Sequence, residues 1–215
     1  MRKARLPRPA KFTESQFLDA TVELVAEAGP AGATMAAIAS RVGAPTGSIY
    51  HRFASREVLL ATLWLRTVSR FQEGFMEALE GPDVDQSALD AVQHSLTWAR
   101  SRSEEARVLL LYRREELAER WPDDLGREMT RINSHTDVAI RQYAQRRYGV
   151  HDDAHIQRLR FVLADLPYAA MRRYLASGQA LPTTLDDLVV KTARWLLSTE
   201  NDAAFWSESE HHEPQ

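Results

Sequence analysis

Hydrophobic side chains recur every three or four residues along most of the chain, the spacing that gathers them on one face of an α-helix. Glycine, proline and hydroxyl-bearing residues bound these segments, and no stretch shows the sustained alternation of a half-buried β-strand. The pattern therefore predicts an all-α protein. The predicted helices cover residues 13–28, 34–42, 46–53, 55–79, 86–102, 104–120, 123–148, 151–177 and 184–198.

The first three predicted helices are short and separated by tight turns. Thr13 and Thr34 stand just before the first two, where a hydroxyl can accept a hydrogen bond from a free N–H of the first turn. Gly43 follows the second helix and supplies the backbone freedom that a sharp turn needs. Pro45 fits the start of a third helix, because its missing N–H is not required there. This arrangement predicts a helix-turn-helix unit.

The third short helix has more hydrogen-bonding groups than apolar ones. Ile49 and Phe53, four residues apart, are strongly apolar and would anchor it. Its other side chains are small, hydroxylated, aromatic or basic: Thr46, Gly47, Ser48, Tyr50, His51 and Arg52. Such a helix suits the DNA major groove, where base edges present donors and acceptors. The alternative is a helical corner that only packs its apolar residues.

The run GSIYHRFASREVLL, residues 47–60, resembles the helix-turn-helix signature of the TetR (tetracycline-repressor) family of bacterial transcription regulators. The resemblance extends over roughly residues 12–64. Arg52 stands where the family usually has His, and Arg56 where it has Lys; both keep a donor for a phosphate. The matching positions are Tyr50, His51, Arg52, Phe53, Ser55, Arg56, Glu57, Leu59 and Leu60.

The resemblance implies a DNA-binding head joined by the long helix to a helical ligand-binding and dimerisation body. The expected domains are a flexible basic arm (1–11), the helix-turn-helix domain (12–54), the effector-binding and dimerisation domain (55–199) and a polar tail (200–215). The start of the third helix would read bases, while basic and tyrosine side chains and two helix starts would hold phosphates. The candidate DNA-binding residues are Thr34, Pro45, Thr46, Gly47, Ser48, Tyr50, His51, Arg52 and Arg56.

One short recognition helix makes few contacts, and helix-turn-helix proteins commonly read two half-sites as twofold dimers. We therefore expect a homodimer on a palindromic operator in double-stranded DNA. The resemblance places the interface on the last two helices. Its candidate residues are Leu159, Val162, Leu163, Leu166, Met171, Leu188, Val189, Trp195 and Leu196. The alternative is that these apolar stripes belong to the core of a single subunit.

Members of the resembled family usually sense a small molecule in a cavity among the middle helices. Candidate ligand-binding residues here are Phe71, Phe75, His94, Trp98, Tyr112 and His135. Each of them also fits a packed aromatic or a hydrogen-bonded histidine. Ligand binding would favour one placement of the long helix and lower DNA affinity. The resemblance to the family implies that the protein is a repressor released by its ligand.

Charge is distributed unevenly along the chain. Residues 1–60 hold eight basic and five acidic side chains, whereas the remainder holds 19 basic and 25 acidic ones. A basic front on an acidic body fits a DNA-binding head with a separate effector domain. The absence of cysteine excludes disulfides and thiolate chemistry. Since no apolar run reaches the length of a membrane span or forms a signal peptide, we expect a cytoplasmic protein without a membrane partner.

Other chemistry is weakly represented. His151 and His155 with Asp152 and Asp153 could be metal ligands, but an acid-rich helix start is the ordinary explanation. No phosphate-binding glycine loop or hydrolase motif is present. We expect no metal, no cofactor and no enzymatic activity. The alternatives to a regulator are an all-helical small-molecule binding protein or enzyme with a vestigial head, and a helical protein-interaction module.

Overall fold

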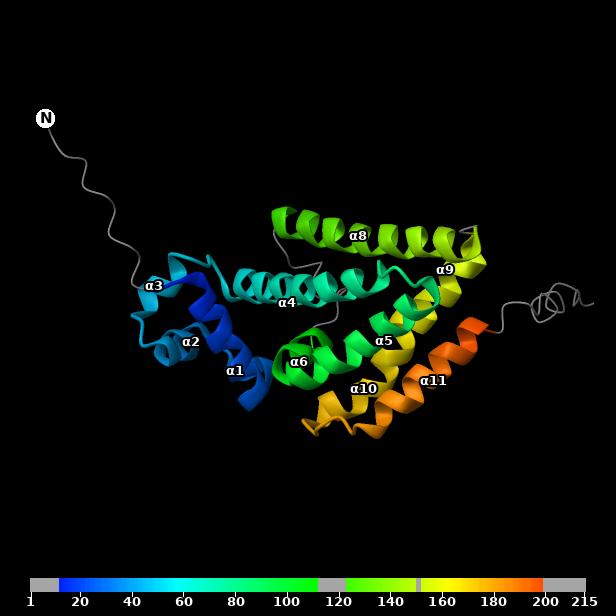
Figure 1. The fold of residues 1–215 in the computed structure, drawn as a ribbon. Coiled ribbons are helices and arrows are strands. Elements are labelled where there is room, and N and C mark those ends of the chain that lie inside the picture. The colour runs from blue at the N-terminus through cyan, green and yellow to red at the C-terminus, as the bar shows by residue number, and fades with distance from the viewer. Residues whose placement is uncertain (1–11, 112–122, 150–151, 199–215) are drawn as a thin grey trace, which may run out of the picture. The chain divides into compact units, whose positions relative to one another are not determined.

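The computed structural model describes residues 12–111, 123–149 and 152–198, and every regular element in these ranges is a helix (Figure 1). The all-α prediction is confirmed. The helices are α1 (Glu14–Gly32), α2 (Met35–Val42), α3 (Thr46–Tyr50), α4 (Arg56–Leu79), α5 (Val84–Ser101), α6 (Ser103–Leu111), α8 (Asp123–Tyr148), α9 (Asp153–Arg160), the π-helical turn η1 (Phe161–Asp165), α10 (Leu166–Ser177) and α11 (Thr184–Ser198). Among the described helices, none has the length and hydropathy needed to span a membrane.

The chain divides into two compact units. The first comprises residues 1–69 and 104–131, and the second residues 70–103 and 132–215. Helices α4 and α8 each contribute to both units. The expected boundary at residue 55 falls inside the first unit, because leucines at the start of α4 are part of the core of the three short helices.

Hydroxyl side chains fix the beginnings of the first two helices, as predicted. The Gln16 backbone N–H donates to the Thr13 hydroxyl (3.3 Å), and the Thr13 N–H donates to the Gln16 side-chain oxygen (2.8 Å). At α2 the Ala37 N–H donates to the Thr34 hydroxyl (3.2 Å). Replacing such a cap by alanine typically costs about 1 kcal/mol, so local sequence sets where these helices begin.

Two helix ends differ from the prediction. Gly29 (φ 70°, ψ −179°) interrupts α1 where its end was expected, but one further turn follows from Pro30. A proline can open that turn because its N–H would be unused there. Helix α3 ends at Tyr50 rather than continuing to Phe53, so the residues between them form a turn.

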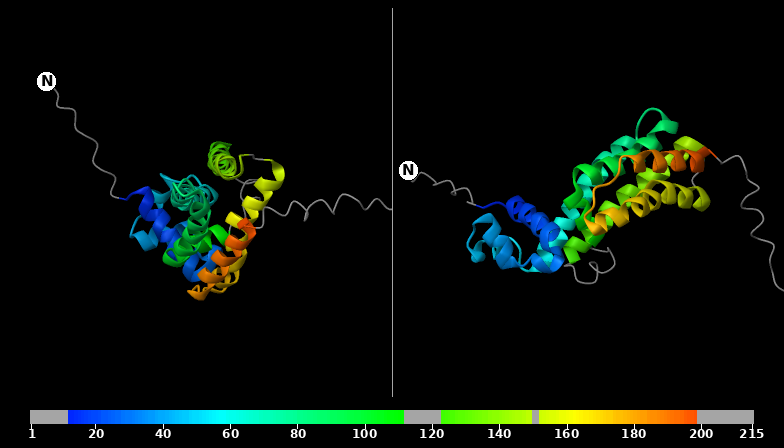
Figure 2. Two further views of the ribbon diagram at one scale, coloured as in Figure 1. Left: turned by 45° about the vertical axis from the view of Figure 1, so that its right-hand side comes forward. Right: turned by 90° about the horizontal axis from the view of Figure 1, so that it is seen from below.

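In the second unit, α10 and α11 lie side by side, and both pack against α5 (Figures 1 and 2). The helix predicted over residues 151–177 contains a wide turn, η1, which immediately precedes α10 and its Pro167. Proline lacks an N–H and clashes with the carbonyl four residues earlier in an α-helix. In the wider turn the Leu166 N–H donates to the Phe161 carbonyl, five residues back. The helix thus continues past the proline.

A charged cluster joins α5 to α11. The Arg100 guanidinium donates to both carboxylate oxygens of Asp186 (3.0 and 2.5 Å), and the Gln93 amide donates to the same carboxylate (3.0 Å). Partial burial raises the pKa of Asp186, but the hydrogen bonds from Arg100 and Gln93 outweigh it, so this pKa lies below its ordinary value. The carboxylate therefore stabilises the fold in its charged form.

We expect Asp186→Asn to lower the free energy of unfolding by about 1.5–3 kcal/mol at neutral pH, because it removes charge-assisted hydrogen bonds. A lowered folded-state pKa gives stability that is present above the unfolded-state value of about 3.9 and is lost as pH falls through the folded-state pKa. The difference between variant and wild type should therefore shrink in acid. Urea unfolding at a series of pH values measures both effects.

Asp187→Asn is the matched control. Asp187 faces solvent and its carboxylate lies 3.7 Å from Lys191, so its loss should change stability by about 0.5 kcal/mol or less. Equal effects of the two substitutions would contradict the assignment of the stabilising contact to Asp186.

Candidate nucleic-acid interface

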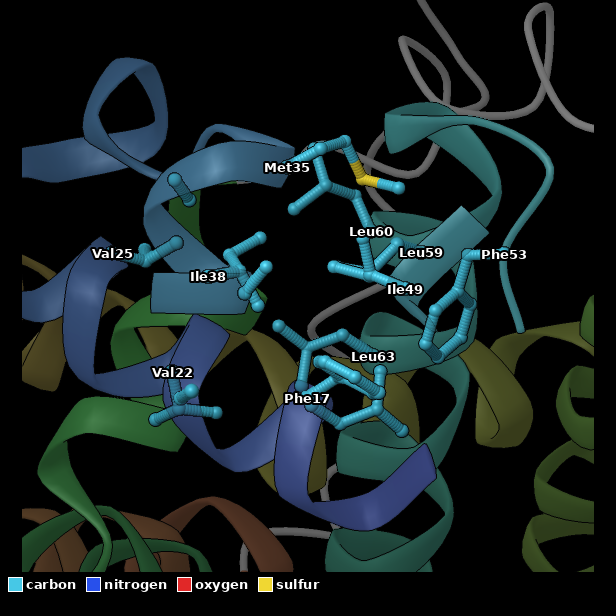
Figure 3. Close-up of a cluster of buried hydrophobic side chains, with 14 of the residues drawn as sticks. Phe17, Val22, Val25, Met35, Ile38, Ile49, Phe53, Leu59, Leu60 and Leu63 are labelled. Carbon is cyan, nitrogen blue, oxygen red and sulfur yellow. The ribbon is translucent and has the colours of Figure 1, made fainter. Parts of the chain in front are cut away.

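Helices α1, α2 and α3 and the start of α4 enclose one hydrophobic core in the first unit (Figure 3). Phe17, Ile38, Ile49 and Leu63, one from each of these helices, are fully buried in it. Burying such a side chain contributes roughly 1.5–3 kcal/mol. The core therefore holds α3 in a fixed orientation within this unit.

The polar side of α3 lies at the surface. Its predicted anchors, Ile49 and Phe53, are 0% and 2% exposed, whereas Tyr50 is 52% exposed. Thr46 and Gly47 are exposed as well. A Cβ built on Gly47 would meet nothing within 4 Å, so the helix start is open to an approaching partner. A helix that is held by one edge and open along the other can enter a groove.

The turn between α2 and α3 has the geometry predicted for it. Gly43 adopts the left-handed conformation (φ 72°, ψ 26°), which favours glycine. Its N–H donates to the Ser40 carbonyl (3.0 Å), and the Ala44 N–H donates to the Ala39 carbonyl (2.9 Å). These bonds close α2 and join it to α3 as one helix-turn-helix.

An ion-pair cluster that the sequence pattern did not indicate fastens α2 to α1. The Arg41 guanidinium lies 2.9 Å from the Glu23 carboxylate and 2.6 Å from that of Glu27. The hydrogen bond from Arg41 lowers the pKa of Glu27. The partners of Arg41 lie one helix earlier in the chain, so the local sequence pattern around Arg41 does not predict this cluster.

Arg52 lies exposed immediately after α3, where a phosphate contact was predicted. One of its guanidinium nitrogens donates to the Phe12 carbonyl (3.0 Å), at the residue before the α1 cap. A guanidinium carries five N–H donors, so this bond orients the side chain and leaves capacity for a phosphate. His51 is exposed beside it.

The structure gives Arg56, a predicted phosphate contact, two partners within its own unit. Its Nε donates to the Ala33 carbonyl (2.8 Å) and its Nη2 forms a short hydrogen bond to the Pro30 carbonyl. The side chain is partly buried and points into its own unit rather than outward. Arg56 therefore holds the start of α4 against the turn between α1 and α2.

The backbone at Thr34 and Pro45, also predicted to contact phosphates, is engaged in hydrogen bonds within its own unit. The Thr34 N–H already donates to the Gly32 carbonyl (2.9 Å), and proline has no N–H to offer. The Pro45 carbonyl accepts from the Ser48 N–H (2.8 Å). Both residues thus shape helix starts, and the Thr34 hydroxyl is the remaining donor at the first of them.

Four of the predicted ligand-binding residues come together in the second unit. The Phe71 ring centroid lies 5.9 Å from that of Phe75, 5.6 Å from that of His94 and 5.3 Å from that of Trp98. His94 Nε2 is 3.0 Å from the Phe71 carbonyl oxygen. A Cβ on Gly74 would lie 2.3 Å from the His94 ring, so this glycine lets the imidazole reach the backbone of α4.

The remaining candidates are His135 and Tyr112. His135 is exposed on α8, which removes it from the predicted pocket. Tyr112 and the expected helix break at Trp121–Pro122 lie outside the described residues. A pocket of about 340 Å³ occurs elsewhere in the second unit, between the end of α4 and α8. It is lined by Leu79, Glu80, Ala139, Gln142, Tyr143, Gln145 and Arg146, none of which was a candidate.

Large apolar side chains are exposed on the helices expected to dimerise, and two of them, Leu188 and Trp195, are residues predicted from sequence. Five predicted residues are buried within their own unit: Leu159, Val162, Leu163, Met171 and Val189. Those on η1, α10 and α11 pack inward because α5 covers the inner sides of these helices. The exposed side chains are Phe161 (49%), Tyr168 (48%), Leu188 (64%) and Trp195 (63%).

The fold and the open α3 define a helix-turn-helix protein with a helical body. Residues 17–63, from α1 into α4, match the family described as bacterial regulatory proteins of the tetR family. The match covers the helix-turn-helix segment and agrees with the resemblance seen in the sequence. No curated protein sequence matches the chain.

Solved structures share the fold over most of the chain. A transcriptional regulator from Rhodococcus sp. Rha1 is 19% identical, with a TM-score of 0.67 over 86% of this chain and 96% of that one. The fatty acid degradation regulator FadR from Bacillus halodurans is 18% identical, with a TM-score of 0.66 over 87% of this chain and 99% of that one. FadR from Bacillus subtilis, in complex with stearoyl-CoA, is 17% identical, with a TM-score of 0.66 over 86% and 98%.

Proposed function

We propose that the protein is a cytoplasmic repressor whose homodimer binds a palindromic operator and releases it when a small molecule binds the helical body. The observation that carries this proposal is the anchoring of α3 by Ile49 and Phe53 with its polar edge exposed. Thr46, Gly47 and Ser48 would face base edges at the groove. Arg52, His51 and the Tyr50 hydroxyl would bind the flanking phosphates.

The exposed apolar side chains of η1, α10 and α11 support the dimer. Four large hydrophobic residues carried by neighbouring helices are typical of an interaction surface. Residues of one protomer would meet the same surface on its partner about a twofold axis. Two copies of α3 would then read two half-sites of one duplex.

An effector with a hydrophobic part is supported by the apolar character of the second unit. The Bacillus subtilis FadR structure, which has the same fold, contains stearoyl-CoA. Binding must discriminate between placements of α4 in order to change DNA affinity, and such coupling is typically about 1–3 kcal/mol. The alternative, a small-molecule binding protein with an unused head, predicts ligand binding without any operator.

Electrophoretic mobility shifts with the DNA flanking the protein's own gene test the proposal. We expect saturable binding that weakens about tenfold or more in Tyr50→Ala and in Arg52→Ala, because each removes a DNA contact in both protomers. Arg52→Ala should also reduce the salt dependence, by about 0.9 in slope for each lost phosphate contact.

Arg141→Ala is the control, because Arg141 is an exposed arginine of α8 in the second unit. It should bind the operator like the wild type. If Tyr50→Ala and Arg52→Ala keep both affinity and salt dependence, the contacts proposed for α3 are wrong. If the wild type shows no saturable binding, the vestigial-head alternative is favoured.

A further inference from the structure

Two polar side chains interrupt the inner face of α8. Ile132, Ala139 and Ile140 on this helix are buried, as an inward stripe requires. Asn133 and Thr136 lie on the same side, three residues apart, and are therefore neighbours on the helix surface. Asn133 Nδ2 and Thr136 Oγ1 are both buried, yet neither makes a hydrogen bond to the protein.

Buried polar atoms without partners are uncommon because they lose the hydrogen bonds that water gave them. Tyr143 shows what a satisfied polar group on this helix looks like: it is buried, and its hydroxyl donates to the Val84 carbonyl (3.0 Å). Asn133 and Thr136 have no equivalent contact. Their polar atoms are therefore open to a ligand that brings a matching hydrogen-bonding group.

A pocket begins one turn further along the same face. Ala139 and Tyr143 line the 340 Å³ pocket together with Leu79 from the end of α4. Thr136 and Ala139 are three residues apart, which corresponds to ~4.5 Å along the helix axis. The volume lies at the lower end of the range for small-molecule sites, about 300–1,000 Å³. An elongated molecule could therefore occupy the pocket and reach the two unpaired groups.

The chemistry of these groups restricts the ligand. An amide N–H needs an acceptor, and a hydroxyl can donate or accept, so the matching group is a carbonyl or hydroxyl oxygen. The apolar wall of the pocket suits a hydrocarbon body. Glu80 at the rim would repel an anion, while the Arg146 guanidinium donates to the Gly81 carbonyl (2.8 Å).

We infer that Asn133 and Thr136 form the hydrogen-bonding part of the effector site, and that the effector is an uncharged, mainly apolar molecule bearing a carbonyl or hydroxyl oxygen. The inference rests on the proposed function, because it names the ligand class of the same regulator. It also moves the polar contacts of the effector site from the predicted His94 and His135 to Asn133 and Thr136.

The test compares three probes of equal chain length: 2-octanone, 1-octanol and octanoate. Thermal unfolding and calorimetric titration of the full chain should show binding of the ketone and the alcohol, and little of the anion. Asn133→Leu and Thr136→Val should weaken that binding tenfold or more. Without ligand, both variants should unfold at the wild-type temperature or about 2–4 °C above it, because an unsatisfied buried group is removed.

Thr192→Val serves as the control, since the Thr192 hydroxyl already donates to the Leu188 carbonyl of its own helix (2.8 Å); it should leave binding of the probes unchanged. Three results would overturn the inference. Octanoate could bind as tightly as the ketone and the alcohol, the ketone and the alcohol could fail to bind, or the two α8 variants could bind them as tightly as the wild type does. Destabilisation of ligand-free Thr136→Val would overturn it as well, because it would reveal a structural hydrogen bond through buried water. Operator binding by the ligand-free wild type reports the proposed function separately, since it does not depend on these probes.

Discussion

Trp195→Glu is expected to convert the protein into a monomer and to weaken operator binding by about a hundredfold or more. Trp195 is 63% exposed on α11, and Leu188, two helical turns earlier, is 64% exposed. A carboxylate placed in an apolar interface loses its hydration without gaining a partner, which strongly disfavours association. A monomer would read one half-site instead of two, so most of the affinity would be lost with the dimer.

Sedimentation velocity and mobility shifts measure the two effects in parallel. Val138→Glu is the matched control, because Val138 is a comparably exposed apolar residue (51%) on α8. It should leave the protein dimeric and able to bind DNA. A dimeric Trp195→Glu would remove α11 from the proposed interface, and a monomeric Val138→Glu would move that interface to α8.

Arg56→Ala is expected to lower the free energy of unfolding by about 2–4 kcal/mol, since it deletes two charge-assisted hydrogen bonds to the carbonyls of Pro30 and Ala33. Arg56→Lys should restore little of this, because an ammonium lacks the guanidinium fork that reaches both carbonyls. Arg52→Ala should change stability by no more than about 0.5 kcal/mol while still weakening DNA binding.

Urea unfolding of the three variants, with mobility shifts under conditions where each is folded, distinguishes these roles. The expected pattern is a stability loss for Arg56→Ala and an affinity loss for Arg52→Ala. If Arg56→Ala instead kept its stability and lost salt-dependent DNA affinity, the phosphate contact predicted from the sequence would be reinstated.

Features that depend on near neighbours in the chain could be predicted from sequence. The Thr13 and Thr34 caps, the left-handed Gly43 and the anchoring pair Ile49 and Phe53 all follow from residue type and a spacing of a few positions. Each depends only on which backbone conformation a residue adopts, or on which side of a single helix it lies. That was sufficient to define the helix-turn-helix and its exposed edge.

Features that depend on the direction of long side chains could not be predicted. Arg52 and Arg56 have the same chemistry, but Arg52 is exposed, whereas Arg56 is partly buried and donates to two carbonyls of its own unit. Helical periodicity likewise shows that α10 has apolar residues without showing which of them α5 covers. Buried Met171 and exposed Tyr168 both fit an amphipathic pattern, and only packing separates them.

The effector site shows the same limit. The aromatic candidates of α4 and α5 do meet, because their positions on two adjacent helices follow the helical repeat. The sequence does not single out Asn133 and Thr136 as ligand contacts, since polar residues on an amphipathic helix ordinarily face solvent. Their significance depends on burial, which composition and spacing do not report.

The wide turn η1 also determines the rotational phase of the chain after it. Successive residues of an α-helix are rotated by about 100°, so the extra residue in a π turn shifts every later side chain by about that angle relative to an uninterrupted helix. Deleting one residue from Phe161–Asp165 would leave α10 helical but rotate its buried face by about 100°. Met171 and Leu175 would rotate toward solvent and their outward neighbours toward α5, so a single-residue deletion would disrupt both the interior and the dimer surface.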